Sequence, residues 1–111
     1  MMTESDIMRE IQLAATKLGS RLMRNNCGQA VTENGYVIRF GLGNPGSADL
    51  IGWTSTGKFL AIEVKRPGKS PTVEQRNFLD AVTKAGGVAG VARSVEDAME
   101  IISRDDTWCD K

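Results

Sequence analysis

Apolar residues recur at different spacings along the chain, and the spacing distinguishes helices from strands. Between Ile7 and Leu22 they recur at helical spacing. This pattern predicts an amphipathic helix over about residues 4–24, capped by Thr3 or Ser5.

Three short apolar segments follow, each bounded by glycine or other turn residues. They are YVIRF at residues 36–40, DLIGW at 49–53 and FLAIEVK at 59–65. Because short turns separate them, they predict three strands in an antiparallel meander.

The rest of the chain predicts a strand between two helices. Ser70 and Pro71 form a good cap and first turn for a helix that ends near Gly86, and Ser94 begins the last helix. The run VAGVA at residues 88–92 is typical of a fully buried strand. A strand, helix, strand order favours a parallel crossover.

These elements predict the α/β class, as a single domain with a mixed β-sheet flanked by helices in the order αβββαβα. A chain of 111 residues is long enough to bury a core of its own. We assign residues 1–104 to this domain and residues 105–111 to an acidic C-terminal tail.

The composition excludes several kinds of catalysis. The chain has no histidine, which excludes serine–histidine and cysteine–histidine pairs, imidazole bases and HExxH zinc sites. Cys27 and Cys109 are too few for a disulfide scaffold or a four-ligand zinc site, so we expect free thiols. Catalysis would therefore depend on carboxylates, lysine and a bound metal.

The first ten residues lack the basic and apolar stretches of a signal peptide, and no segment approaches the roughly 20 apolar residues of a membrane-spanning helix. We therefore expect an intracellular, cytoplasmic protein without a membrane partner. The net charge is zero, which argues against a generally basic surface, although basic residues cluster around residues 58–76.

A glycine-rich motif after the first predicted strand does not indicate a dinucleotide site. Residues Gly41–Gly46 spell GxGxxG, but a dinucleotide site requires this motif to open a helix, and here it leads into the strand at residues 49–53. A flexible or sharply turning loop is the better interpretation.

The segment FLAIEVK carries charge on one face. Side chains alternate along a strand, so Glu63 and Lys65 share the face opposite Ile62. They could be ordinary surface residues. However, Asp49 begins the adjacent predicted strand, so Asp49 and Glu63 can converge and, with the main-chain carbonyl of Val64 and water, supply the oxygen ligands that Mg²⁺ prefers. Lys65 could then orient or deprotonate a water, or stabilise charge on a phosphate.

These residues resemble the D…ExK site of the PD-(D/E)XK nucleases, and in detail the VRR-NUC (virus-type replication-repair nuclease) domain. The matching segments span nearly the whole chain: Glu10-Ile11-Gln12, Arg24-Asn25-Asn26, GSADLIG at residues 46–52, FLAIEVKRPGKSPTVEQ at 59–75 and AGGVAGVARSVEDA at 85–98. Ala48 departs from the pattern by replacing a proline that shapes a loop and binds no metal.

The resemblance implies a restriction-endonuclease-like fold and metal-dependent cleavage of DNA, with Mg²⁺ as the ion and Mn²⁺ as a substitute. It makes Asp49 and Glu63 metal ligands and Lys65 the catalytic lysine. Glu10 matches the acidic residue of the first helix, for which Glu4 is the alternative. Gln75 matches the family's glutamine, which could hydrogen-bond Lys65 or the ligands, although it could equally be an exposed helix residue.

The function that this resemblance implies is a structure-specific endonuclease of DNA repair or recombination, similar to a Holliday-junction resolvase. Such an enzyme would act on branched DNA as a homodimer in a bacterial or phage setting. The alternatives are a catalytically silent DNA-binding or assembly subunit and a nuclease with another structure preference. Phosphate contacts could come from four basic residues, or these could be ordinary solubilising charges: Lys58, Arg66, Lys69 and Arg76.

The aromatic residues allow two interpretations each. Tyr36 and Trp53 could stack on bases, although a tryptophan on a strand is more often part of the core. Trp108 could be a dimer contact or part of a disordered tail.

Overall fold

The computed structural model describes residues 2–26, 28–40 and 46–105. Cys27, Cys109, Trp108 and the first five residues of the GxGxxG motif lie outside the described residues. In the part of the chain that is described, none of the helices is both long and apolar enough to cross a membrane.

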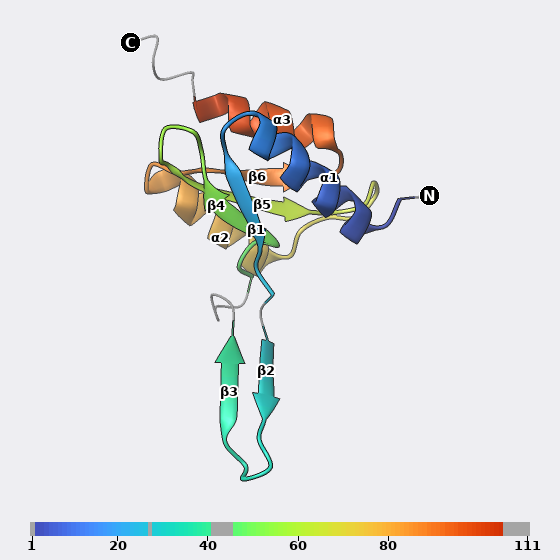
Figure 1. Ribbon diagram of the computed structural model, residues 1–111, viewed down its shortest axis with the longest axis vertical. Helices are drawn as coiled ribbons and strands as arrows, with labels where there is room; N and C mark the ends of the chain where they lie inside the picture. Colours follow the sequence, from blue (N-terminus) through green and yellow to red (C-terminus); the bar gives the residue numbers. More distant parts are fainter. Residues whose placement is uncertain (1, 27, 41–45, 106–111) are drawn as a thin grey trace.

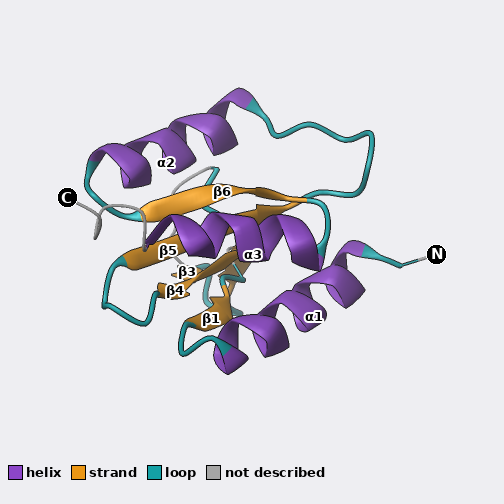
Figure 2. Ribbon diagram, turned by 90° about the horizontal axis from the view of Figure 1, so that it is seen from above, coloured by secondary structure: helices purple, strands orange, loops and turns teal. Residues whose placement is uncertain are grey.

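A four-stranded mixed sheet forms the centre of the molecule, with helices on both faces. Its strand order is β1 (Arg21–Arg24), β4 (Leu50–Trp53), β5 (Phe59–Val64) and β6 (Val88–Ala92). β4 pairs antiparallel with β1 and β5, whereas β5 and β6 are parallel. In Figure 2, α1 (Glu4–Lys17) and α3 (Val95–Ser103) cover one face and α2 (Val73–Lys84) covers the other. The expected α/β class, with a mixed sheet flanked by helices, is confirmed.

The two faces of β5 explain its sequence. Leu60, Ile62 and Val64 are buried in the core beneath α1 and α3, while Ala61 packs into a smaller apolar cluster with Leu79 of α2. The alternation predicted for this strand is therefore correct. Glu63 follows Ala61 on the α2 face and is only 1% exposed, so it is not a surface residue.

A second sheet contains the strand predicted at residues 36–40 and another strand that the sequence did not predict. β2 (Gly28–Val31) and β3 (Val37–Phe40) form an antiparallel hairpin that projects away from the body of the molecule (Figure 1). Val31, Tyr36, Val37 and Ile38 on this hairpin are exposed.

The observed order of elements is αβββββαβα, so the predicted order αβββαβα was wrong in lacking β1 and β2. The first helix ends at Lys17 rather than near residue 24, because Gly19 takes a positive φ of 83° and the chain enters β1. Leu22 fits both helical and strand spacing, and it is buried as a strand residue. The predicted meander was wrong in its first pair, since β3 pairs with β2 and β4 pairs with β1.

The cap of α2 also differs from the expectation. Thr72, not Ser70, is the N-cap, because Thr72 and Gln75 form a reciprocal capping box. The predicted caps of the other helices are confirmed, with Thr3 at α1 and Ser94 at α3.

Asp105 packs into the domain rather than extending from it. It is 2% exposed, its carboxylate accepts hydrogen bonds of 2.8 Å from Thr56 Oγ1, and it lies 3.4 Å from Lys58 Nζ. The first residue of the expected acidic tail is thus fixed against the turn between β4 and β5.

Candidate active site

Asp49 and Glu63 meet where the β4–β5 ladder ends. The last paired residues are Leu50 and Ile62, and one further step of the same antiparallel register places Asp49 opposite Glu63. Because side chains alternate, both carboxylates lie on the face covered by α2. The predicted convergence of these two residues on neighbouring strands is confirmed by the pairing.

The two oxygens of Glu63 have different surroundings. Oε2 accepts a hydrogen bond of 2.9 Å from Gln75 Nε2 and lies 3.6 Å from Lys65 Nζ. Oε1 is buried, and within the described residues it has no hydrogen-bond partner. A buried carboxylate oxygen without a partner is costly, so this oxygen is ready to bind a cation or a proton.

Burial and the neighbouring Asp49 carboxylate raise the pKa of Glu63 to about 7 from an ordinary value of 4.5, although Lys65 acts in the opposite direction. Two carboxylates in a water-poor site repel each other, and positive charge relieves that repulsion. The site therefore attracts a cation.

Asp49 is held by main-chain contacts. Its Oδ2 accepts a hydrogen bond of 3.0 Å from the backbone N–H of Val64, and its carbonyl accepts one of 2.8 Å from Asn25 N. Asn25 Nδ2 donates to Ala48 O and Ser47 Oγ, both at 3.0 Å. The end of β1 thus fixes the loop that carries Asp49.

The first turn of α2 holds the other side of the site. Gln75 Nε2 donates to Glu63, while Gln75 Oε1 accepts from Thr72 N at 2.8 Å. Gly46 has a positive φ of 83°, and a Cβ there would lie 2.5 Å from the backbone of Glu74. The loop before Asp49 and the start of α2 are therefore in direct backbone contact.

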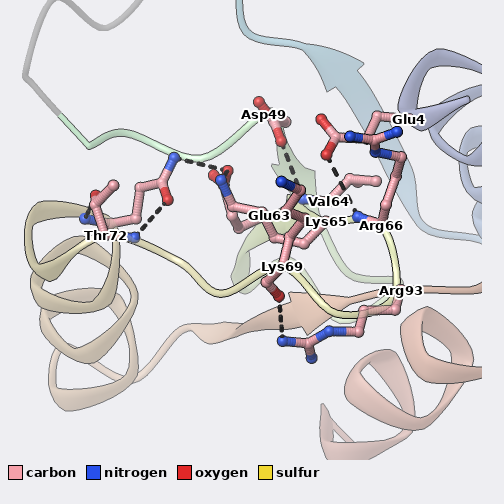
Figure 3. A network of polar contacts seen from close by, with 10 residues as sticks. Glu4, Asp49, Glu63, Val64, Lys65, Arg66, Lys69, Thr72 and Arg93 are labelled. Carbon is pink, nitrogen blue, oxygen red and sulfur yellow. Dashed lines mark hydrogen bonds and ion pairs between the residues drawn. The ribbon is translucent and has the colours of Figure 1, made fainter.

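A basic loop continues from the site, and several elements hold it (Figure 3). Arg66 N donates to Glu4 Oε2 of α1 at 3.3 Å, and Arg93 Nη2 donates to Lys69 O at 2.8 Å. Lys65, which precedes this loop, has a side chain that is 18% exposed, and its ammonium lies 3.6 Å from Oε2 of the buried Glu63 carboxylate.

Some predicted residues do not join this cluster. Glu10 is exposed and lines a hollow with Met2, Ile7, Pro67 and Arg93, beside the segment after Lys65, and within the described residues it forms no metal-binding group of three with Asp49 and Glu63. Of the two alternatives on the helix, Glu4 is the one that contacts Arg66.

Two of the four basic residues proposed to contact phosphate also lie away from the loop after Lys65. Lys58 precedes β5, at the opposite end of the strand from Glu63, and pairs with Asp105. Arg76 is exposed on α2 and lines a hollow with Pro71, Leu79 and Arg104. Only Arg66 and Lys69 follow directly on the loop after Lys65.

The residues present fit a divalent ion. Asp49 and Glu63 supply carboxylate oxygens, and Oε1 of Glu63 has no hydrogen-bond partner among the residues that the structure describes. The donors are all oxygen, which suits Mg²⁺ or Mn²⁺. No group of three or more Asp, Glu, Cys or His side chains with metal-binding geometry occurs in residues 2–26, 28–40 and 46–105. Other ligands would then be the Val64 carbonyl, water or the substrate.

Sequence reasoning missed three residues that shape the site: Gly46, Thr72 and Arg93. The pattern Thr72-x-x-Gln75 is a capping-box signature and could have identified Thr72 as the cap. The close approach of Gly46 to α2 and the Arg93 contact depend on tertiary packing, for which no local signal exists.

Comparison with known proteins gives one match. No curated protein and no solved structure matches the chain significantly. The family model of the VRR-NUC domain matches residues 14–96, a range that includes Asp49, Glu63, Lys65 and Gln75 and excludes Glu4 and Glu10. Since this match covers most of the chain, the protein belongs to the VRR-NUC domain family, whose members are nucleases of the PD-(D/E)XK type.

Proposed function

We propose that this nuclease is a Mg²⁺-dependent endonuclease that hydrolyses phosphodiester bonds in branched DNA, with Asp49, Glu63 and Lys65 at its active site. The observation that carries the proposal is the buried Oε1 of Glu63, which lies in the carboxyl group beside Asp49 and Lys65 and has no hydrogen-bond partner in the described part of the chain. Family membership supports the reaction class, because PD-(D/E)XK domains generally use divalent ions to cleave DNA.

Asp49 and Glu63 would hold the ion, with the main-chain carbonyl of Val64 as a further ligand. A divalent ion there would supply positive charge beside the phosphate and make water easier to deprotonate near pH 7. Mn²⁺ would substitute for Mg²⁺, because both accept carboxylate and water oxygens.

Lys65 has two roles in this proposal. Its ammonium lies 3.6 Å from Glu63 Oε2, so it is held next to the carboxylate pair, and its partial exposure lets it reach a bound phosphate. From this position it can orient the attacking water or stabilise the negative charge that develops on the phosphate. Gln75 fixes Glu63 by its 2.9 Å hydrogen bond.

The first helix contributes through Glu4 rather than Glu10 in this proposal. Glu4 accepts a hydrogen bond from the backbone of Arg66, the residue after Lys65, whereas Glu10 lines a hollow with Pro67 and Arg93. Glu4 would therefore steady the segment that carries the lysine, although the Glu-Ile-Gln motif favours Glu10.

Substrate binding would begin at the loop after Lys65. Arg66 and Lys69 are exposed there and can contact phosphates next to the scissile bond, and Arg76 could extend the contact along α2. Lys58 would contact only DNA that passes the far end of β5. Such contacts bind the backbone without reading sequence, which is consistent with recognition by shape.

The proposed preference for branched DNA goes with a proposed homodimer, for reasons of symmetry. A two-fold dimer presents one site to each of two strands, which matches the symmetry of a four-way junction. Size-exclusion chromatography with light scattering would measure the mass of the protein alone and with junction DNA.

Cleavage of matched, end-labelled DNAs tests the function. A four-way junction, splayed arm, flap, duplex and single strand of common sequence are incubated with wild type and Lys65→Ala, in Mg²⁺, Mn²⁺ or chelator. Symmetric junction cutting that requires metal and Lys65 supports the proposal. Lysine-dependent cutting of other forms rejects the junction preference, and DNA binding without cutting under any metal supports the catalytically silent alternative.

A further inference from the structure

We propose that Thr72 is a positioning residue for the active site, which acts on Glu63 through the side-chain amide of Gln75. This inference rests on the proposed function, since it assigns a role to Thr72 in holding a ligand of that site. Thr72 lies outside the ExK motif, and the hydrogen bonds that connect it to Glu63 pass through Gln75 (Figure 3).

Three hydrogen bonds connect the cap of α2 to Glu63. Thr72 Oγ1 accepts from Gln75 N at 3.1 Å, and Thr72 N donates to Gln75 Oε1 at 2.8 Å. Gln75 Nε2 then donates to Glu63 Oε2 at 2.9 Å. The same amide therefore closes the capping box with its oxygen and binds the carboxylate with its nitrogen.

The chemistry of these partners fixes the orientation of the amide. A backbone N–H can only donate, so the atom of Gln75 that faces Thr72 N must be the oxygen. Glu63 Oε2 lies 3.6 Å from the Lys65 ammonium, so it acts as an acceptor even when Oε1 carries a proton, and the atom that faces it must be the nitrogen. Both ends require the same orientation. Thr72→Ala keeps the backbone N–H that faces Gln75 Oε1 but loses Oγ1, which accepts from Gln75 N and holds residues 72 and 75 in the capping geometry, so it weakens one of the two constraints indirectly.

The other capping box shows why a glutamine is needed here. At α1, Thr3 and Asp6 form the same reciprocal box, with Thr3 N donating to Asp6 Oδ2 at 3.0 Å. Asp6 can only accept when ionised, so it completes a cap but could not also donate to a carboxylate. Gln75 does both, which connects the start of a helix to the active site.

The position of Glu63 follows from this connection. Its Oε2 is held by Gln75 and Lys65, and this leaves Oε1 as the oxygen for which residues 2–26, 28–40 and 46–105 provide no hydrogen-bond partner. If the amide rotated, its oxygen would face Oε2 and repel it. Glu63 would then sample other rotamers, and its affinity for a divalent ion would fall.

The experiment compares Thr72→Ala with Thr72→Ser and with Ser94→Ala. Ser94 caps α3 by accepting from Asp97 N at 3.1 Å, the same length as the Thr72 cap, but α3 lies on the opposite face of the sheet from Gln75. Ser94→Ala therefore controls for the loss of a helix cap alone. Serine at 72 retains the hydroxyl and should restore the wild-type properties.

Mn²⁺ affinity, measured by electron paramagnetic resonance, and the kinetics of DNA cleavage are the readouts. We expect Thr72→Ala to weaken Mn²⁺ binding by about tenfold and to lower kcat by a similar factor, with KM for DNA changed by less than about twofold. Ser94→Ala should lower Tm to the same extent as Thr72→Ala and leave Mn²⁺ affinity and kcat unchanged.

A double-mutant cycle tests whether Thr72 acts through Gln75. In a Gln75→Ala background, Thr72→Ala should produce no further loss of Mn²⁺ affinity, because the amide that it orients is gone. Full additivity of the two losses, or a Thr72→Ala variant that behaves like Ser94→Ala, would overturn the proposal.

A measurement without metal distinguishes failure of this inference from failure of the proposed function. The side-chain amide protons of Gln75 should exchange slowly in wild type and Thr72→Ser, and should lose protection in both Thr72→Ala and Glu63→Ala when followed by NMR. If wild type neither binds Mn²⁺ nor cuts DNA, the proposed function fails. Unchanged protection in Thr72→Ala would instead reject the positioning role.

Discussion

Asp49 and Glu63 face each other across the open end of the β4–β5 ladder, one step beyond the pair Leu50 and Ile62. Asp49 also accepts the backbone N–H of Val64, so its carboxylate is fixed against the strand that carries Glu63. The fold thus forces two acidic groups together on a covered face of the sheet. This arrangement destabilises the metal-free protein and favours a cation, which connects the pairing of the strands to the proposed activity.

Removal of Lys65 should abolish cleavage without unfolding the protein. Its side chain is partly exposed and its ammonium serves the site rather than the core, so we expect Lys65→Ala to reduce kcat by about 10³-fold or more. Lys84→Ala, which removes an exposed lysine at the end of α2, is the matched control and should retain full activity. Full cleavage by purified Lys65→Ala would refute the assigned site.

Removal of the Glu63 carboxylate should likewise abolish turnover, since the proposed site loses a metal ligand. We expect Glu63→Ala to fold, to show no cleavage and to lose Mn²⁺ binding. Circular dichroism checks the fold and isothermal titration measures the binding. Retained activity in this variant would exclude Glu63 as a ligand.

The two acidic residues of α1 should differ in their effect. Glu4 accepts a hydrogen bond from Arg66 N, so Glu4→Ala should loosen the segment after Lys65 and lower kcat by about tenfold. Glu10→Ala should change kcat by less than about twofold. The ratio of the two kcat values, at equal folded fraction, measures the difference. A larger loss in Glu10→Ala would restore the residue that the Glu-Ile-Gln motif favours.

Stability of the metal-free protein should fall as pH rises. The folded-state pKa of Glu63 is raised to about 7, above its unfolded value near 4.5, so the folded state keeps a proton that the unfolded chain has lost. The loss of stability therefore begins near pH 4.5 and is complete above pH 7. Relative to Glu63→Gln, wild type should lose on the order of 2 kcal/mol between pH 5 and pH 8.

Urea unfolding in chelator at both pH values measures this difference. The same pH dependence in wild type and Glu63→Gln would show that Glu63 titrates normally. Saturating Mg²⁺ should stabilise wild type more at pH 8 than at pH 5, because the ion competes with the proton for the carboxylate.

The centre of the fold could be predicted because its signals are local. Alternation in FLAIEVK assigned Ile62 and Glu63 to opposite faces, and the adjacent strand placed Asp49 within reach. β1 was missed because Leu22 satisfies helical and strand spacing equally, and only pairing with Gly52 of β4 decides between them. Pairing over such a distance in sequence leaves no local pattern.

The sequence indicated which residues could form the site but not all of their contacts. Glu10 was favoured over Glu4 only through the Glu-Ile-Gln motif, and helical spacing could not show that Glu4 accepts the hydrogen bond from Arg66 N. Similarly, Lys58 is near Lys65 in sequence but lies at the other end of an extended strand. The positions of these side chains relative to Lys65 depend on how the helices and strands pack, and the D…ExK motif does not specify that packing.

Gly46 should be the glycine whose substitution affects both stability and activity. Gly46 and Gly57 both have a positive φ, 83° and 91°, so alanine causes similar backbone strain of about 1 kcal/mol at each. A Cβ at Gly57 would meet no atom of the described residues within 4 Å, whereas one at Gly46 would lie 2.5 Å from the Glu74 backbone and 2.8 Å from Gln75 N. Gly46→Ala must therefore push the loop that carries Asp49 away from the helix that holds Glu63.

We expect Gly46→Ala to destabilise the protein by about 2 kcal/mol more than Gly57→Ala, as measured by urea unfolding. In the folded fraction, Mn²⁺ affinity should fall in Gly46→Ala and stay unchanged in Gly57→Ala, because only the first substitution separates the two ligand-bearing segments. Equal effects of the two substitutions would mean that backbone strain alone is responsible. In that case, contact between the Asp49 loop and α2 would not determine the spacing of the site.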